Sequence, residues 1–452
     1  MRDLISMQEQ SRRGHSWNGI VIVYMIVGVP VLAAVFLSTG ARMPDRLVLF
    51  GNGMLTAVAL ATYVLRDRIP ISHILFILFF LVLVFATLWS EAAGEGGAGN
   101  NFKSLIGCFL WSSVFLFGRL FFARDRDLRR AFRILWIVGY GISASVYGSV
   151  LSHIVGGSFG EVLIFGGAGL RAFGPIGDQV GFIIALFVVM ALVRRRWLAF
   201  GVHLAAMALT GTRGAVVVLG VSLLALWIFD WKESGSLLGK WRLTHGLLFI
   251  CIVAAVLMSP SGAYLLVRTF NSELLLSTGS ARLGSMALGM SVFLDNPLKG
   301  VGYAGFRDVV WGYAPERYFD IVLQNYIATT SNQYLQTATD GGIIALTVLI
   351  SLLALMIYNA QTASRIFRGV VSPSLMAARA WMVGIVLGNQ TAVWLLPGSL
   401  VAYLLFLVAA MHEAILSRVA LRGDYACNSA PQPGSGESRG ERASGRGWRT
   451  HP

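Results

Sequence analysis

Two arginines beside glycine-rich turns are the residues of this chain best suited to chemistry on a phosphate group. Arg213 lies in Thr-Gly-Thr-Arg-Gly at 210–214, and Arg282 lies in Ser-Thr-Gly-Ser-Ala-Arg-Leu-Gly at 277–284. A guanidinium grips phosphate oxygens through paired hydrogen bonds, and glycine lets a backbone approach a ligand closely. Arg213 and Arg282 are therefore candidate residues for binding a phosphorylated ligand. Arg171, in the glycine- and proline-rich turn at 169–179, is a third candidate.

A hydroxyl-rich turn, Thr-Thr-Ser-Asn-Gln-Tyr at 329–334, is the second feature that could take part in a reaction. Ser331 and Asn332 are its candidate catalytic residues, and Tyr334 is a candidate for binding substrate. Each arginine and this turn, taken singly, also fit an interface anchor and a merely polar loop. Two arginines and a hydroxyl-rich turn on one face of a membrane are harder to explain in that way.

Three carboxylates close to this turn are candidate proton acceptors by location. They are Glu316, Asp320 and Asp340, and Asp320 is our candidate base. Loop carboxylates are more often simply solvated, so the alternative for each is a surface charge. No cluster of histidine, cysteine or carboxylate suggests a metal site, and no cofactor is predicted.

Most of these residues fall in one long polar stretch, 264–341, which is too polar to lie in lipid. A loop of this length inside a compact protein normally indicates function. Its middle part, from Arg282 to an Asn-Pro and Gly-x-Gly turn at 296–302, reads as a helix that lies on the membrane. The stretch is therefore predicted to cap a membrane protein and to hold the reacting groups.

Composition places the chain in the membrane. It has 452 residues, of which 56% are hydrophobic and 13% are charged, with a mean hydropathy of +0.69. A soluble domain has roughly 25% charged residues. The net charge of +14 comes from Lys and Arg between apolar blocks and in the tail, so nucleic acid is not a predicted partner. The three cysteines do not indicate a disulfide framework.

Apolar windows of about 20 residues can cross the hydrocarbon core. The sequence predicts an all-α polytopic protein of about twelve spans, near 18–38, 46–65, 70–90, 102–122, 132–155, 176–193, 197–211, 213–230, 245–263, 342–358, 380–396 and 399–416. Only the break at Gly211–Gly214 separates the seventh span from the eighth.

The distribution of Lys and Arg predicts the orientation, because cytoplasmic connections retain the excess. With both termini inside, the cytoplasmic segments hold 26 of these residues and the outer segments hold 10, half of them in the long loop. The chain is thus divided into a cytoplasmic N-terminus, nine spans, an outer loop that carries the site, three spans and a disordered basic tail: 1–17, 18–263, 264–341, 342–416 and 417–452.

The order of these motifs resembles the O-antigen ligase and O-antigen polymerase superfamily, bacterial membrane glycosyltransferases that act on undecaprenyl-diphosphate-linked glycans. The resemblance rests on the turn at 210–214, Arg282 ahead of Asn-Pro-Leu-Lys-Gly-Val-Gly at 296–302, and Asn-Gln-Tyr-Leu at 332–335. It covers residues 170–345 in detail, and the span layout extends it to the whole chain.

The resemblance implies a multi-pass protein of the bacterial inner membrane whose active face is periplasmic. In this family the arginines matching Arg213 and Arg282 hold the diphosphate of the lipid carrier while an acceptor hydroxyl attacks the donor's first sugar. No metal takes part on this account. The implied partners are an undecaprenyl-diphosphate-linked oligosaccharide, the lipid bilayer, and candidate chain-length regulator and flippase proteins.

One departure from the family selects among its activities. Ligases carry a histidine just before the Asn that matches Asn332, whereas this chain has Ser331 there. A serine cannot replace imidazole as a proton acceptor at neutral pH. The sequence therefore favours a polysaccharide polymerase. The alternatives are an O-antigen ligase that transfers glycan to lipid A core and a transporter or flippase of the same lipid-linked sugar, although such transporters generally need ionisable groups in mid-membrane.

Overall fold

The computed structural model describes residues 19–29, 42–65, 69–92, 98–122, 124–156, 179–233, 272–313, 329–367, 372–388 and 399–428. These ranges contain helices, turns and bends and no strand, which confirms the predicted all-α class. Each predicted span except 245–263 overlaps a described helix, and that segment lies outside the described residues.

The first half of the bundle consists of helices that range from one turn to 31 residues in length. They are η1 (Tyr24–Gly28), α3 (Arg42–Leu65), α4 (Ile71–Ala92), α5 (Ala98–Ser112), α6 (Val114–Phe121) and α7 (Asp125–Val155). Across the described residues, five helical stretches are long and apolar enough to cross a membrane: Ile71–Ala92, Asn101–Phe121, Asp125–Ser152, Gln333–Ile366 and Leu400–Val419. The chain is therefore a multi-pass membrane protein.

A short helix lies at the centre of the second half. α9 (Val180–Val193) is apolar along its length, and residues 180–191 are all buried. It packs against α10 (Trp197–Leu209), α11 (Arg213–Glu233) and α18 (Ser372–Val383). A helix that is apolar on every side needs such neighbours.

The predicted break between spans seven and eight is confirmed. α10 ends at Leu209, Gly211 has a φ of 61°, and α11 begins at Arg213. A Cβ on Gly181, near the start of α9, would meet Thr210 at 2.9 Å. The turn between α10 and α11 therefore packs beside the start of α9.

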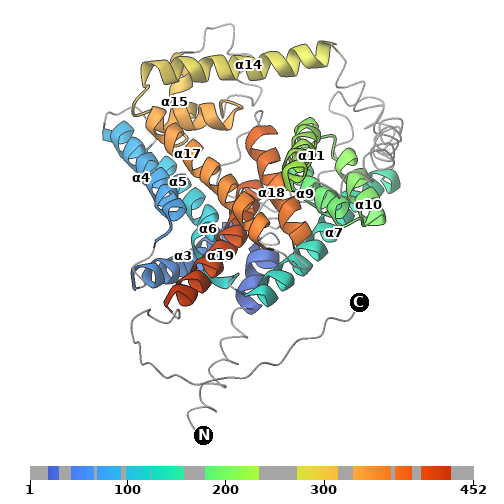
Figure 1. Cartoon of the computed structure of the whole chain (residues 1–452). Helices are drawn as coiled ribbons and strands as arrows, with labels where there is room; N and C mark the ends of the chain where they lie inside the picture. Colours follow the sequence, from blue (N-terminus) through green and yellow to red (C-terminus); the bar gives the residue numbers. More distant parts are fainter. Residues whose placement is uncertain are drawn as a thin grey trace, which may run out of the picture.

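The described parts of the long polar stretch, 272–313 and 329–341, are largely helical. They contain α14 (Ser272–Asp295), α15 (Phe306–Val309) and the short 3-10 helix η3 (Val310–Gly312). Figure 1 shows α14 lying across one end of the bundle, as the predicted surface helix would. We call this the α14 end of the molecule.

The helix that follows this stretch begins earlier than predicted. α17 runs from Gln333 to Ile366, whereas hydropathy placed the start of the span at 342. The predicted boundary is instead a kink, where Gly341 and Gly342 leave helical geometry. Hydropathy detects the apolar part beyond the kink and misses the polar first turns, which are helical because Asn332 caps them.

The last predicted spans also shift. α18 begins at Ser372, eight residues before the predicted 380–396 window, and is followed directly by the π-helix η6 (Gly384–Gly388). Arg379 therefore lies inside α18. Its side chain is fully buried, with the guanidinium carbon 4.3 Å from the centre of the Phe229 ring. The aromatic face supplies a cation–π partner for a charge inside an apolar helix.

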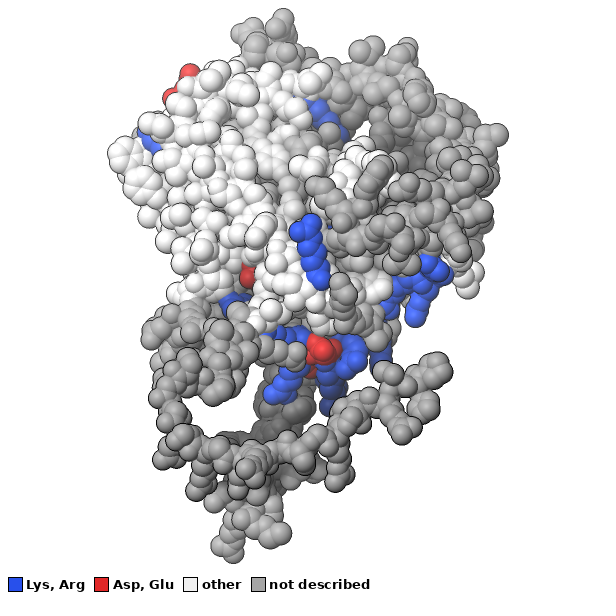
Figure 2. Space-filling model, in the orientation of Figure 1, with Lys and Arg blue, Asp and Glu red and all other residues white. Residues whose placement is uncertain are grey.

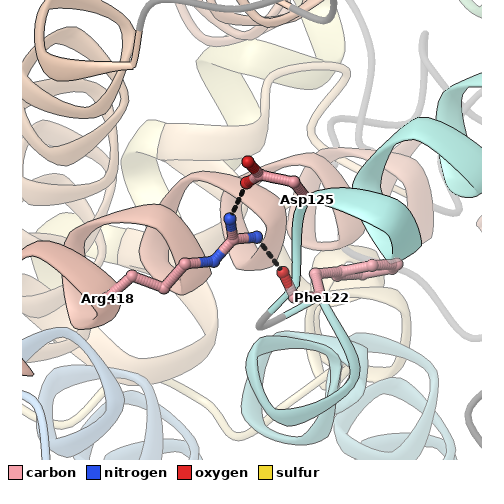
Figure 3. Close-up of polar contacts among 3 residues, drawn as sticks. All are labelled: Phe122, Asp125 and Arg418. Atoms are coloured by element: carbon pink, nitrogen blue, oxygen red, sulfur yellow. Dashed lines mark hydrogen bonds and ion pairs between the residues drawn. The ribbon is translucent and has the colours of Figure 1, made fainter. Parts of the chain in front are cut away.

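The C-terminal helix overturns part of the predicted disordered tail. α19 runs from Leu400 to Asn428, so residues 417–428 are helical, and 429–452 lie outside the described residues. Figure 3 shows one cause: Arg418 donates to the carboxylate of Asp125 and to the carbonyl oxygen of Phe122, 2.7 Å away. These contacts join the last turns of α19 to the start of α7.

Basic side chains gather at the end of the molecule opposite α14 (Figure 2). They belong to the last turn of α6 and the turn after it, to the start of α7, to the turn after α9, to the end of α17 and to the second half of α19: Arg119, Arg124, Arg126, Arg129, Arg130, Arg133, Arg194, Arg195, Arg196, Arg365 and Arg418. In Arg194, burial and the neighbouring Arg196 lower the pKa of the guanidinium. Among the described residues, basic side chains are therefore concentrated at the end opposite α14.

Candidate functional site

One face of α14 is directed toward the hydroxyl-rich turn. The hydroxyl of Ser285 donates to the Ser331 hydroxyl at 3.1 Å or to the Thr329 carbonyl at 3.2 Å. One turn further along, a Cβ on Gly289 would lie 2.6 Å from the Thr330 methyl group. Arg282 precedes Ser285 by three residues, so it lies on the same face of the helix. The structure therefore brings Arg282 to the side of α14 that faces Ser331.

The turn itself ends in a helix cap. The side-chain oxygen of Asn332 accepts the backbone N–H groups of Tyr334 at 2.9 Å and Leu335 at 3.0 Å. This is the N-cap arrangement that satisfies the otherwise unbonded first amides of a helix. Ser331 has a φ of 58°, the left-handed region. Asn332 therefore has a structural role, and the catalytic roles of Ser331 and Asn332 stay predictions.

Tyr334 ties the start of α17 to η6. Its hydroxyl donates to the Val386 carbonyl oxygen at 2.6 Å. The tyrosine hydrogen thus goes to the protein backbone. Its assignment as a substrate-binding residue stays a prediction.

The same π-helix packs on the first turns of α11. A Cβ on Gly388 would meet the Cα of Val218 at 3.1 Å, and Gly384 packs on the same residue. Arg213 is the first residue of α11, five positions before Val218. The backbone of Arg213 therefore lies at the α14 end, although its side chain is not among those that the structure describes.

The segment 296–302 pairs with the kink of α17 through its backbone. Val301 N donates to Thr339 O at 2.8 Å, Gly302 N to Asp340 O at 2.9 Å, and Ile343 N to Pro297 O at 2.8 Å. Gly342, with a φ of 70°, has no room for a Cβ because the Leu298 carbonyl occupies that space. Two motifs that are about forty residues apart in sequence are thus joined by backbone hydrogen bonds.

A small cavity lined by both polar and apolar side chains lies behind the hydroxyl-rich turn. Its volume is about 40 Å³, enough for a water molecule and too small for a sugar. It is lined by side chains from α4, α5, α17 and the loops between them: Phe79, Leu83, Cys108, Tyr303, Ala304, Thr329, Gln333, Gln336, Thr337 and Asp340. Burial raises the pKa of Tyr303 well above its usual range, so its phenol stays neutral.

Asp340 is part of this cavity and is buried, with 4% of its surface exposed. Gln336 Nε2 donates to its Oδ1 at 2.8 Å. The sequence analysis predicted either a solvated loop carboxylate or a base at this position. The prediction of a solvated carboxylate is wrong, because the side chain of Asp340 is buried. The sequence analysis gave no role to Ser285, nor to Gln336, which follows the hydroxyl-rich turn in the same motif. Helical spacing was the available signal, since Ser285 follows Arg282 by three residues and Asp340 follows Gln336 by four.

Three candidates cannot be placed. Arg171, Glu316 and Asp320 all lie outside the described residues. Among the residues that the structure does describe, no three His, Cys, Asp or Glu side chains gather as a metal site. Arg171, Asp320 and the metal-free chemistry therefore stay predictions.

Residues 198–350 match the family model Wzy_C, described as O-Antigen ligase. The match begins in α10 and ends within α17, so it includes the turn before Arg213, α14 and the cap at Asn332. No curated protein matches the chain by sequence. The family match confirms the resemblance to the O-antigen ligase and O-antigen polymerase superfamily, whose members are membrane glycosyltransferase-like proteins.

Proposed function

We propose that this chain, which carries the domain of the O-antigen ligase and O-antigen polymerase superfamily, is a polysaccharide polymerase. It would transfer an oligosaccharide from undecaprenyl diphosphate to a sugar hydroxyl of another repeat unit. The product would be O-antigen, capsule or exopolysaccharide. The reaction would take place at the periplasmic face of the inner membrane.

The proposal is carried by the contact between Ser285 and Ser331, 3.1 Å apart. This contact joins the Arg282 face of α14 to the cap of α17. The hydroxyl of Tyr334 bonds to η6, and η6 packs against α11, whose first residue is Arg213. Residues that the sequence analysis chose separately for anion binding and for the hydroxyl-rich turn therefore belong to one end of the molecule.

The proposed reaction is a glycosyl transfer in which undecaprenyl diphosphate is the leaving group. The acceptor hydroxyl attacks the anomeric carbon of the donor's first sugar, the new glycosidic bond forms, and the bond to the diphosphate oxygen breaks. The hydroxyl proton passes to a base, for which Asp320 is our candidate, and undecaprenyl diphosphate leaves with the bonding electrons. Arg213 and Arg282 would bind the leaving diphosphate, whose negative charge grows in the transition state.

The distribution of basic residues supports the orientation. Basic residues gather opposite α14, and cytoplasmic connections retain Lys and Arg. On this reading α14, the hydroxyl-rich turn and the start of α11 face the periplasm. A lipid-linked glycan is presented on that side once a flippase has moved it across the membrane.

A second candidate function is ligation of glycan to lipid A core, because the matching family is described as O-Antigen ligase. Against it stands Ser331, where ligases have a histidine. The glycans of a deletion strain separate the two. Loss of a polymerase leaves single repeats capped on the acceptor, loss of a ligase leaves long unattached polymer, and loss of a flippase leaves lipid-linked repeats on the cytoplasmic side.

A further inference from the structure

Two hydrogen bonds connect the buried carboxyl of Asp340 to the hydroxyl-rich turn. Gln336 Nε2 donates to Asp340 Oδ1 at 2.8 Å, and Gln336 Oε1 accepts the backbone N–H of Thr330 at 2.9 Å. Thr330 directly precedes Ser331. The side chain of Gln336 thus bridges a carboxyl inside the protein and the backbone of the candidate site.

The carboxyl determines which way the Gln336 amide points. A backbone N–H can only donate, so the amide oxygen of Gln336 must face Thr330 and its NH₂ must face Asp340. An acceptor is therefore required at position 340. The Ala304 backbone N–H also donates to this carboxyl, so Asp340 accepts from two directions.

Burial makes the connection stiff. The exposed fractions are 4% for Asp340, 4% for Gln336 and 0% for Thr330, so water does not compete from bulk solvent. A buried polar group is costly unless it is hydrogen-bonded, and removal of one partner leaves the other unsatisfied. Each of the three groups is therefore held in place by the next.

The turn needs such support because of its backbone. Ser331 has a φ of 58°, a conformation that is unfavourable for any residue other than glycine. Strained conformations persist when their surroundings hold them. Here the Thr330 amide is fixed on one side of Ser331 and the Asn332 cap on the other. Ser331 is thereby presented to Ser285 and to the Arg282 face of α14.

We propose that Asp340 is a positioning residue that acts through Gln336 to hold Ser331 opposite α14. This inference rests on the proposed function, since Ser331 and Arg282 are the groups that it would align. Asp340 itself does not touch substrate on this account. Its loss would weaken catalysis by letting the turn move while the arginines still bind the donor.

A disulfide reports the position of the turn independently of enzyme activity. We would introduce Ser285→Cys and Ser331→Cys together into the full chain, with Cys251 and Cys427 changed to serine and the buried Cys108 retained. The two hydroxyl oxygens lie 3.1 Å apart, so the paired cysteines should oxidise readily. Adding Gln336→Ala should slow disulfide formation at least tenfold.

The matched control is Gln333→Ala. It removes an amide of the same size from the same helix and cavity, and this amide donates to Thr337 within α17. Disulfide formation should stay within twofold of the parent in this control. Equal rates in the parent, Gln336→Ala and Gln333→Ala, with all three proteins folded in detergent, would overturn the proposal.

A second variant tests the role of the carboxyl without removing side-chain volume. Gln336→Glu keeps an acceptor for Thr330 but places two carboxyls face to face, and such a pair must share a proton. The shared proton is present at low pH and lost as pH rises. Disulfide formation relative to the parent should therefore be near one at low pH and fall with rising pH; a ratio that does not change with pH would contradict the role of Asp340.

Transfer by the purified enzyme separates this inference from the proposed function. Without the cysteine pair, Gln336→Ala should lower kcat at least tenfold and leave KM for the lipid-linked donor within twofold. Unchanged kcat would overturn the inference. If the disulfide results hold but the parent transfers no glycan, the proposed function fails while the structural link from Asp340 to Ser331 stands.

Discussion

The α14 end and the interior of the bundle are held together in different ways. At the α14 end, residues 297–302 and 339–343 pair through backbone hydrogen bonds, and glycine provides the space for them. In the interior, α9 is buried along residues 180–191 by apolar packing against α10, α11 and α18. Backbone pairing fixes one geometry, whereas apolar packing tolerates substitutions that keep volume. The candidate site therefore lies where the chain is least tolerant of change.

The largest expected effect is the loss of activity on removing an arginine at the α14 end. Arg282→Ala and Arg213→Ala should each lower polymer formation at least a hundredfold, the typical effect of removing a group that stabilises developing negative charge. Membrane insertion should be unaffected because neither change alters an apolar residue of a predicted span. Polymer length on gels, with protein amount by immunoblot, provides the measurement. Wild-type polymer from either variant would remove the diphosphate-binding role of that arginine.

The backbone pairing between 297–302 and 339–343 should be the part of the fold whose stability is most sensitive to substitution. Gly342→Ala places a Cβ where the Leu298 carbonyl lies, at a φ of 70°. Left-handed strain and the overlap together should cost roughly 3 kcal/mol or more of unfolding free energy. Thermal unfolding of the detergent-purified protein would measure it.

The control for that change is another glycine of the helix bundle, Gly220→Ala in α11. No atom of the described residues lies within 4 Å of a Cβ at this position. Alanine favours a helix by about 1 kcal/mol over glycine. The control should be neutral or slightly stabilising. If both substitutions lowered the melting temperature equally, the distinction between the two regions would be lost.

A smaller effect is expected at the helix cap. Asn332→Ala should destabilise the protein by about 1 kcal/mol, because two backbone amides of α17 lose their acceptor. Asn332→Asp keeps an acceptor and should restore most of that loss. Chemical denaturation would compare the three proteins. A catalytic role for Asn332 beyond capping would appear as an aspartate variant that is stable but inactive.

The smallest effect is expected in the apolar interior. Met356→Leu replaces one buried side chain of α17 with another of similar volume, in the part of the helix that follows the kink. Such exchanges usually cost less than about 1.5 kcal/mol. Polymer formation should stay near wild type. A complete loss of polymer from this variant would show that the interior is as specific as the α14 end.

The sequence predicted the helical class, the break before Arg213 and the surface helix that carries Arg282, because hydropathy and glycine spacing are local signals. It missed the docking of 297–302 on the α17 kink, since backbone pairing between distant segments leaves no periodic pattern. The cap at Asn332 could have located the start of α17, because asparagine is a preferred N-cap residue. The burial of Asp340 depends on α4 and α5, which sequence alone did not bring near it.

The most direct test of the central claim is the side of the membrane on which the two arginine segments lie. Thr212→Cys and Leu283→Cys, introduced singly into the chain after replacement of its native cysteines, stand next to Arg213 and Arg282. Both should react with a membrane-impermeant thiol reagent added to the periplasmic side of intact cells. Labelling of one position from the periplasm and of the other only from the cytoplasm would show that Arg213 and Arg282 cannot bind one diphosphate.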